Sequence, residues 1–318
     1  MDWTPQITTL TDQVLEHYVF PEVAESVVKV LRERLAAGAY TEITTDEALA
    51  EAVTADLQSV NGDKHLRLLH SVDEVPEHDA FDQAAYRQQV ELSGHGIARV
   101  ERLPGNVGYV DTRMFHWPGL AGERAVAAMT LVADTDALLF DLRRNVGGTP
   151  GMVSLLCTYL FGPDWPQTHL NSIYDRPADE TQQYWTLPFV PGPRFGPDKP
   201  IYVLTGPGTF SAAEEFAYDL QTRGRATIVG ERTKGGANPG GRSRVGPHLR
   251  SSIPSGRAVN PVTGTNWEGV GVAPDLAVPA EEAYDHAYKL ALEHVLTLGE
   301  TGYRRIVAEE AREALAIM

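Results

Sequence analysis

The chain has 318 residues, 42% hydrophobic and 22% charged, a composition typical of a globular protein with one large or two ordinary domains. Its 27 Lys and Arg against 43 Asp and Glu give a formal charge of −16, which argues against a nucleic-acid or anionic-membrane partner. The single cysteine, Cys157, excludes an internal disulfide, and no apolar run approaches the ~20 residues of a membrane helix. The N-terminus lacks the features of a secretory signal, so we expect a cytoplasmic protein without membrane insertion.

Residues 4–60 predict three helices, which begin near Pro5, Pro21 and Thr45. Apolar residues recur in them at a spacing of three or four, and their outer faces are charged. We therefore expect a small N-terminal helical bundle over residues 1–70.

From about residue 97, strands and helices alternate. The expected strands are 107–112, 137–142, 200–205, 226–230 and 248–253, and the expected helices are 121–134, 149–161, 211–223 and 280–298. Such alternation predicts an α/β fold with a mostly parallel sheet. The expected organisation is a helical domain at 1–70, a connecting segment at 71–100, an α/β core at 101–279 and C-terminal helices at 280–318.

Residues 162–199 form a long interruption of this alternation. They contain seven prolines and four tryptophan or tyrosine residues. Long loops in compact domains are often functional, so this excursion is expected to be ordered and to line a substrate cleft, unless it serves packing or an oligomer contact.

Ser211 lies where an expected strand, ending near Leu204, turns through a Gly/Pro segment into a helix that begins at Ala212. Such a junction exposes a hydroxyl at the sheet edge, beside the free N–H groups of the first helical turn. A serine nucleophile requires this arrangement. The alternative is that Ser211 is only a helix cap, with Glu214 completing a capping box.

Gly147 and Gly148 end the loop that follows the expected strand at 137–142. Paired glycines allow close approach of the backbone and present N–H donors that can stabilise an oxyanion. The alternative is a tight structural turn. In either case Asp141, Arg143 and Asn145 are expected to tie this loop down by hydrogen bonds.

Together these stretches resemble the tail-specific (C-terminal processing) serine protease superfamily, with its tricorn-core and interphotoreceptor retinoid-binding protein branches. The matching pieces occur in the family's order: YVFPE at 18–22, GDKHLR at 62–67, GYV at 108–110, DLRRNVGG at 141–148, TFSAAE at 209–214, RATIVGERT at 225–233, GGAN at 235–238 and WEGVGVAPD at 267–275. The resemblance implies an α/β core related to the crotonase and Clp-protease fold. No segment resembles the PDZ module of many tail-specific proteases.

The resemblance implies two alternatives for the general base. The tail-specific branch uses a lysine 25 residues after the serine, but that position is Gly236 here, and Lys234 is read as a solvated loop residue. The tricorn-like branch uses Ser–His–Glu, and His65 and Glu268 stand at the matching positions. A neutral imidazole can accept the serine proton at pH 7, and a carboxylate can orient it.

The resulting hypothesis is a serine peptidase that forms an acyl-enzyme on Ser211, with His65 as base and Glu268 as the residue that orients it. The oxyanion donors would be the N–H groups of Ala212 and of Gly147 or Gly148. The substrate would be a peptide or protein, no metal or cofactor is implied, and homo-oligomerisation is left open. The alternatives are an apolar-ligand (retinoid-like) binding protein on the same scaffold and a hydrolase of small acyl substrates.

Overall fold

The computed structural model describes residues 1–77, 82–162 and 167–318. The chain forms two compact units that are interleaved in sequence. Unit 1 comprises residues 1–82, 172–182 and 236–259, and unit 2 comprises residues 83–171, 183–235 and 260–318. Within the described ranges, no helix is both long and apolar enough to cross a membrane.

Unit 1 begins with the three predicted helices. These are α1 (Thr4–His17), α2 (Pro21–Ala36) and α3 (Asp46–Gln58). Each buries one face, because its apolar residues recur every three or four positions, as Ile7, Leu10 and Val14 do in α1. The Thr45 hydroxyl accepts a hydrogen bond from the Ala48 N–H at 3.2 Å and so caps α3 as expected.

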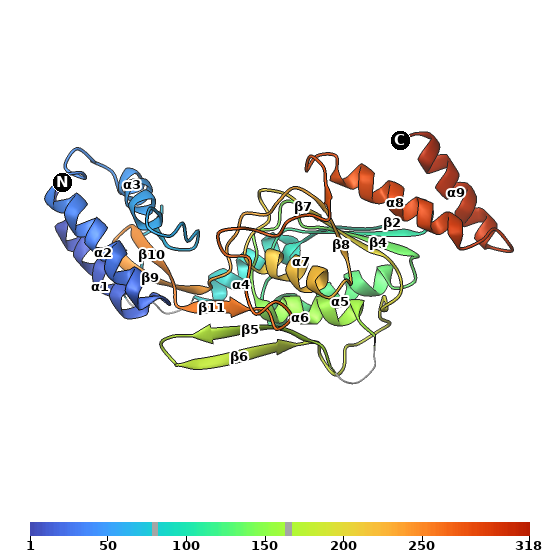
Figure 1. The fold of residues 1–318 in the computed structure, drawn as a ribbon, viewed down its shortest axis with the longest axis horizontal. Helices are drawn as coiled ribbons and strands as arrows, with labels where there is room; N and C mark the ends of the chain where they lie inside the picture. The colour runs from blue at the N-terminus through green and yellow to red at the C-terminus, as the bar shows by residue number, and fades with distance from the viewer. Residues whose placement is uncertain (78–81, 163–166) are drawn as a thin grey trace. The chain divides into compact units, whose positions relative to one another are not determined.

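A three-stranded antiparallel sheet completes the core of unit 1. Its order is β1 (Arg67–His70), β10 (Leu249–Pro254) and β9 (Gly240–Gly246). In Figure 1, β9 and β10, in orange, lie beside the blue helices. The expectation that 248–253 joins the parallel sheet is wrong. Leu249 and Ile253 instead pack into the helical core, because alternate residues of β10 face these helices.

A second small sheet has the order β11-β5-β6. Its strands are β5 (His169–Asp175), β6 (Glu180–Trp185) and β11 (Gly256–Val259). Two of the three strands come from the 162–199 excursion, which is ordered where it is described; residues 163–166 lie outside the described residues.

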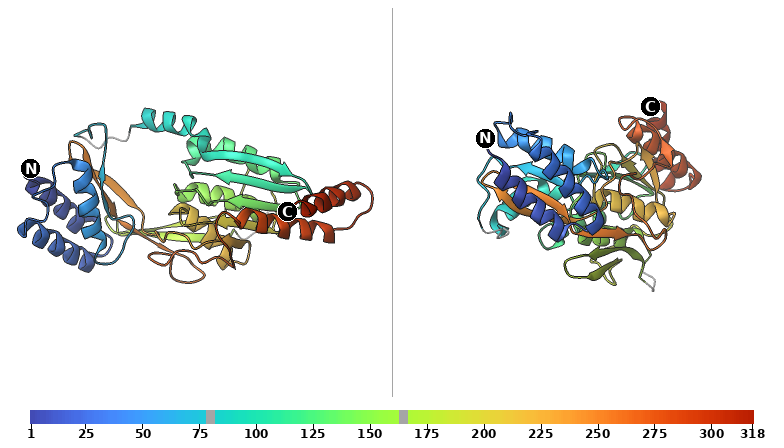
Figure 2. Two further views of the ribbon diagram at one scale, coloured as in Figure 1. Left: turned by 90° about the horizontal axis from the view of Figure 1, so that it is seen from above. Right: turned by 60° about the vertical axis from the view of Figure 1, so that its left-hand side comes forward.

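Unit 2 contains a six-stranded sheet, which confirms the predicted fold class. Its order is β12 (Leu276–Ala277), β8 (Thr227–Gly230), β7 (Ile201–Thr205), β4 (Ala137–Asp141), β3 (Val107–Thr112) and β2 (Ile97–Leu103). All neighbours are parallel except β2, which runs antiparallel to β3. Figure 2 (left) shows these strands edge to edge. The central strands are continuous apolar runs, because helices cover both of their faces.

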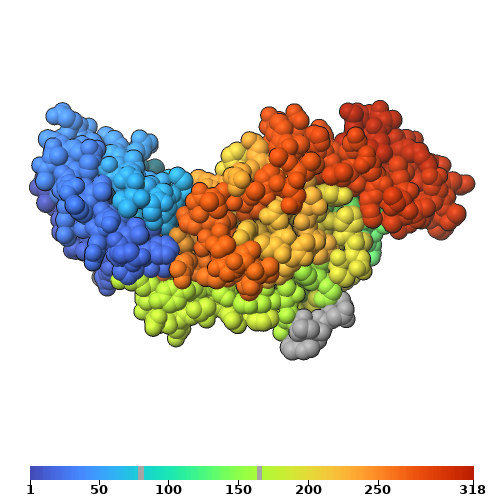
Figure 3. All heavy atoms as spheres, viewed as in Figure 1, coloured from blue at the N-terminus to red at the C-terminus, as the bar shows by residue number. Residues whose placement is uncertain are grey.

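Helices pack on the two faces of this sheet (Figure 1). One face carries α5 (Pro118–Val132), α6 (Pro150–Leu160) and α7 (Ala212–Thr222). The other carries α8 (Ala283–Thr297), on which α9 (Arg304–Ala316) packs. In Figure 3 this C-terminal pair appears as a continuous red surface. Neighbouring residues of β4 face opposite layers: Leu139 joins the α8 cluster, and the Phe140 ring lies 4.7 Å from that of Phe216 in α7.

Two further helical segments in unit 2 were not predicted. They are α4 (Gln83–Leu92) and the short 3-10 turn η1 (Gly94–Gly96). In α4 the one fully buried residue is Val90, so the apolar periodicity that reveals a helix is almost absent.

Two carboxyl groups lie inside unit 2, one turn apart on α7. Glu215 and Asp219 are 3% and 0% exposed. Burial raises the pKa of Glu215 to about 7, and burial together with the Glu215 charge raises the pKa of Asp219 well above its ordinary value. Asn260 donates to Asp219 Oδ1 at 2.9 Å, and the Arg223 guanidinium partly opposes the rise.

We therefore expect the stability of the protein to fall as the pH rises. The raised pKa values mean that the folded state binds more protons than the unfolded chain, so the contribution is complete below about pH 4 and is lost through pH 7 and above. Glu215→Gln and Asp219→Asn should each flatten the decline in Tm between pH 5 and pH 8. Variants with the wild-type slope would show that the pair is ionised in the folded protein.

Candidate active site

The carboxyl ends of β4 and β7 lead into the two loops that the sequence singles out. In a parallel sheet these ends lie at the same edge, which is where α/β proteins bind their ligands. The loop after β4 contains Gly147 and Gly148, and the turn after β7 contains Ser211. The two loops are in direct contact: the Phe210 N–H donates to the Asn145 carbonyl at 3.1 Å.

Ser211 has a backbone conformation that is rare for residues with a side chain. Its φ is 58° and its ψ is −126°, outside the basins that such residues favour. A conformation of this kind costs free energy and persists only when its surroundings impose it. A strained strand-to-helix turn of this kind presents the nucleophilic serine of α/β-hydrolases.

Thr209 holds the turn before Ser211 in place. Its hydroxyl donates to the Leu142 carbonyl at 2.8 Å and accepts the Gly206 N–H at 3.0 Å. One buried threonine therefore fastens the end of β7 to the end of β4.

Glu214 is fully buried and holds the strand-to-helix turn at Ser211, here called the elbow, from the other side. Its Oε2 accepts the Ser211 N–H at 2.8 Å, which confirms the expected capping role. Its Oε1 accepts the Thr233 hydroxyl at 2.5 Å and the Gly235 N–H at 2.6 Å. The capping and nucleophile interpretations of Ser211 are thus compatible, since the same carboxylate caps α7 and holds the strained residue.

The segment that carries Glu268 is attached to this network. The Val272 N–H donates to the Thr233 hydroxyl at 2.7 Å, and the Gly269 N–H donates to the Gly235 carbonyl at 3.2 Å. Trp267 is 2% exposed, and its ring centroid lies 5.5 Å from that of Tyr218 in α7. Glu268 itself is half-buried on a loop fixed from two sides.

The loop between β4 and α6, here called the glycine loop because it contains Gly147 and Gly148, packs directly against the elbow. A Cβ on Gly147 would lie 2.7 Å from the Ser211 Cβ, and one on Gly148 would lie 2.0 Å from the Phe115 carbonyl oxygen. Their φ values are 102° and 141°, so both positions require glycine. The Gly147 N–H donates to Asn145 Oδ1 at 2.9 Å. Among the described residues, nothing accepts a hydrogen bond from the N–H groups of Gly148 and Ala212.

The expected anchoring of this loop is also present. Asp141 accepts the Arg143 N–H at 3.0 Å, the Arg143 guanidinium at 2.6 Å and the Tyr109 hydroxyl at 2.8 Å. Arg143 donates in turn to the Ala280 carbonyl at 2.9 Å. The start of the loop is therefore tied down by hydrogen bonds.

His65 belongs to unit 1, whereas Ser211, Ala212, Gly147, Gly148 and Glu268 belong to unit 2. The His65 N–H donates to Asp63 Oδ1 at 3.0 Å. Asp63 is 1% exposed, and its Oδ2 accepts the Tyr18 hydroxyl at 3.0 Å and the Asn238 amide at 3.1 Å. Three separate motifs of the sequence thus meet around the loop that carries His65.

Lys234 is exposed, as predicted. Its Nζ lies 4.8 Å from the centroid of the Phe210 ring. Its backbone N–H donates to the Thr209 carbonyl at 3.1 Å. The lysine is therefore close in space to the elbow.

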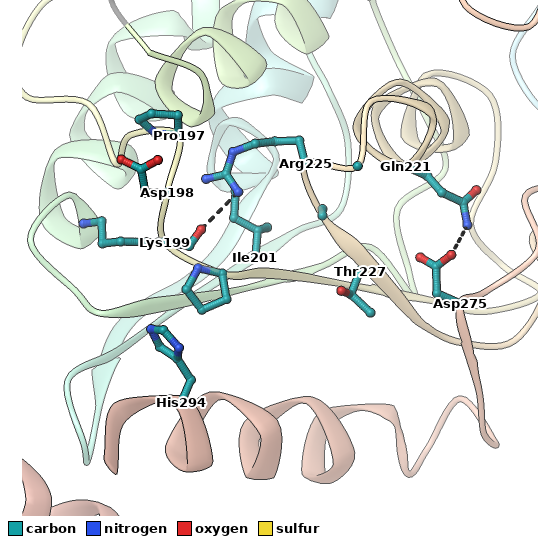
Figure 4. Close-up of a pocket in the computed structure, with 12 residues that line it drawn as sticks. Pro197, Asp198, Lys199, Ile201, Gln221, Arg225, Thr227, Asp275 and His294 are labelled. Carbon is teal, nitrogen blue, oxygen red and sulfur yellow. Dashed lines mark hydrogen bonds between the residues drawn. The ribbon is translucent and has the colours of Figure 1, made fainter. Parts of the chain in front are cut away.

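A separate open pocket of about 530 Å³ lies at the amino ends of β7 and β8, the opposite edge of the sheet from Ser211. Figure 4 shows Arg225 and Lys199 on its wall. Arg225 donates to three backbone carbonyls and Lys199 to two, so both cations hold loops together. The described residues that line it include no serine and no cysteine.

The model of peptidase family S41 matches residues 106–278, more than half of the chain. The model of the N-terminal domain of peptidase S41 in eukaryotic IRBP matches residues 3–93. The chain belongs to peptidase family S41, which confirms the resemblance seen in the sequence.

A carboxyl-terminal-processing protease of Synechocystis sp. is 29% identical over 174 residues, which are 54% of this chain and 37% of that protein. The chain thus spans little more than a third of that relative's length. Two solved structures share the fold. The photosystem II D1 C-terminal processing protease has a TM-score of 0.52 at 15% identity, covering 87% of this chain and 93% of that one. The tricorn protease has a TM-score of 0.56 at 11% identity, covering 99% and 37%.

Thr233→Val tests whether the Glu214 network holds the elbow. It should lower the free energy of unfolding by about 1–3 kcal/mol, because it leaves the buried Val272 N–H without an acceptor and removes one of the two donors to Glu214 Oε1. Urea unfolding measures this loss. Thr233→Ser keeps the hydroxyl and serves as the control; equal stability of the two variants would contradict the network.

Proposed function

We propose that the chain is a serine peptidase that hydrolyses peptide bonds through an acyl-enzyme on Ser211. The observation that carries the proposal is the strained Ser211 backbone beside the N–H groups of Ala212 and Gly148, which have no acceptor among the residues described. Strain that a buried network maintains, next to N–H donors left open, is expected at a nucleophile and has no use in a plain helix cap.

In the proposed reaction, Ser211 Oγ attacks the carbonyl carbon of the scissile peptide bond while His65 accepts its proton. The oxyanion accepts hydrogen bonds from the Ala212 and Gly148 N–H groups. Of the two candidate glycines we favour Gly148, because the Gly147 N–H already donates to Asn145. The imidazolium then gives its proton to the leaving amine, and water attacks the acyl-enzyme by the same route in reverse.

Glu268 would fix the tautomer of His65 and stabilise the imidazolium. Support comes from the firm attachment of its loop to α7 through Trp267 and to the Glu214 network through Gly269. Support for His65 comes from the Asp63 network, which fixes the backbone of its loop.

A carrier of apolar ligands is the second candidate function. It is favoured by the match of residues 3–93 to the N-terminal domain of S41 in eukaryotic IRBP. One apolar cavity within the described residues, between Phe115, Met152 and Leu156, holds only about 10 Å³ and is too small for an extended apolar ligand.

Ser211→Ala is expected to abolish cleavage of fluorescein-labelled casein. Ser211→Gly should be equally inactive but at least as stable as Ser211→Ala, because glycine adopts a φ of 58° without strain. Thermal melts and cleavage rates of the two purified variants measure both effects. Wild-type cleavage by either variant would exclude Ser211 as the nucleophile.

The general base is tested by a pair of variants. His65→Ala should lose at least ~10³-fold in kcat, whereas Lys234→Ala should lose less than tenfold, since its ammonium is exposed. The wild-type rate should rise with pH as the imidazole that accepts the Ser211 proton becomes neutral. An inactive Lys234→Ala beside an active His65→Ala would assign the base to the lysine.

A further inference from the structure

Asn145 contacts both walls of the candidate site, although sequence analysis gives it only an anchoring role. It is fully buried in the middle of the loop that follows β4. Its side chain binds the glycine loop, and its backbone carbonyl accepts the N–H of Phe210, the residue before Ser211.

The two ends of the Asn145 carboxamide have different partners. Oδ1 accepts the Gly147 N–H at 2.9 Å, and Nδ2 donates to the Thr112 hydroxyl at 3.0 Å, at the end of β3. Thr112 is itself 3% exposed. Because both bonds are buried, the carboxamide has one orientation, with its acceptor directed at Gly147.

The peptide unit between Gly147 and Gly148 is thereby held on both sides. The Phe115 N–H donates to the Gly147 carbonyl at 2.7 Å, and the Thr149 N–H donates to the Phe115 carbonyl at 2.7 Å. In a trans peptide the N–H points away from the C=O. The bond from Phe115 therefore directs the Gly148 N–H away from β3, while the bond to Asn145 occupies the preceding N–H.

We propose that Asn145 is a positioning residue for the oxyanion hole. Its side chain accepts the Gly147 N–H, so that the Gly148 N–H is the one that donates to the substrate. Its backbone carbonyl accepts the Phe210 N–H and so holds the elbow beside the glycine loop. This inference rests on the proposed peptidase function and extends it to the residue that decides which donor is used.

Asn145→Ala is the direct test. It removes the acceptor of the Gly147 N–H but keeps the backbone bond to Phe210, so the elbow stays attached. The assay measures cleavage of a fluorogenic peptide whose sequence is that around a casein bond cut by the wild-type protein. We expect kcat to fall ~30- to 100-fold while KM changes less than ~3-fold, because a misdirected donor affects the oxyanion and not the bound substrate.

A transition-state mimic separates this role from general loosening of the fold. A peptide aldehyde of the same sequence forms a tetrahedral adduct with the serine, and its affinity should fall by the same factor as kcat/KM. In a Ser211→Ala background, Asn145→Ala should leave the Kd of the uncleaved peptide unchanged. An unchanged aldehyde affinity, or a kcat within threefold of wild type, would overturn the proposal.

Thr112 supplies matched variants should Asn145→Ala fail to fold. Thr112→Val removes the partner of the Asn145 amide and should lower kcat at least threefold, whereas Thr112→Ser should match wild type. Equal rates for the two would overturn the proposal. The proposed function is tested separately, because an active Ser211→Ala would refute the peptidase mechanism whatever the Asn145 and Thr112 variants do.

Discussion

The candidate site depends on a positive φ at a residue that is not glycine. Ser211 keeps this conformation because hydrogen bonds from two directions hold the residues around it. The buried carboxylate of Glu214 accepts the Ser211 N–H, and the carbonyl of Asn145 accepts that of Phe210. The free energy stored in this turn is offset by its surroundings, which is the usual relation between strain and a functional site.

The same contacts assemble the other parts of the site. Through Thr233 and Gly235, Glu214 also holds the segment on which Glu268 stands. Through Asn145, the elbow contacts the glycine loop at the end of the neighbouring strand. A few buried polar side chains near the ends of the parallel strands thus position each proposed catalytic group in unit 2. The strands themselves are held in place by the apolar core of the sheet.

Much of the fold could be predicted from the sequence, because helices such as α2 have a clear apolar periodicity and buried strands such as β7 are short apolar runs with clear ends. The helix α4 buries little and could not. The strand β10 was found but placed in the wrong sheet, since its alternating residues do not say which core they enter. At the site, local patterns suggest Ser211 and the two glycines as candidates, and these remain predictions. The bond from the Gly147 N–H to Asn145 is local, of the kind that asparagine commonly makes two residues on, but the contact with Thr112 that orients the carboxamide is tertiary and no pattern reveals it.

The central claim, that Ser211 is an activated nucleophile, is tested most directly by covalent labelling. The full chain is treated with a fluorophosphonate near pH 8 and digested, and the modified peptide is located by mass spectrometry. A serine in an elbow beside two N–H donors should be labelled stoichiometrically and alone among the serines of the chain. Failure to label, or labelling of other serines to the same extent as Ser211, would contradict the account.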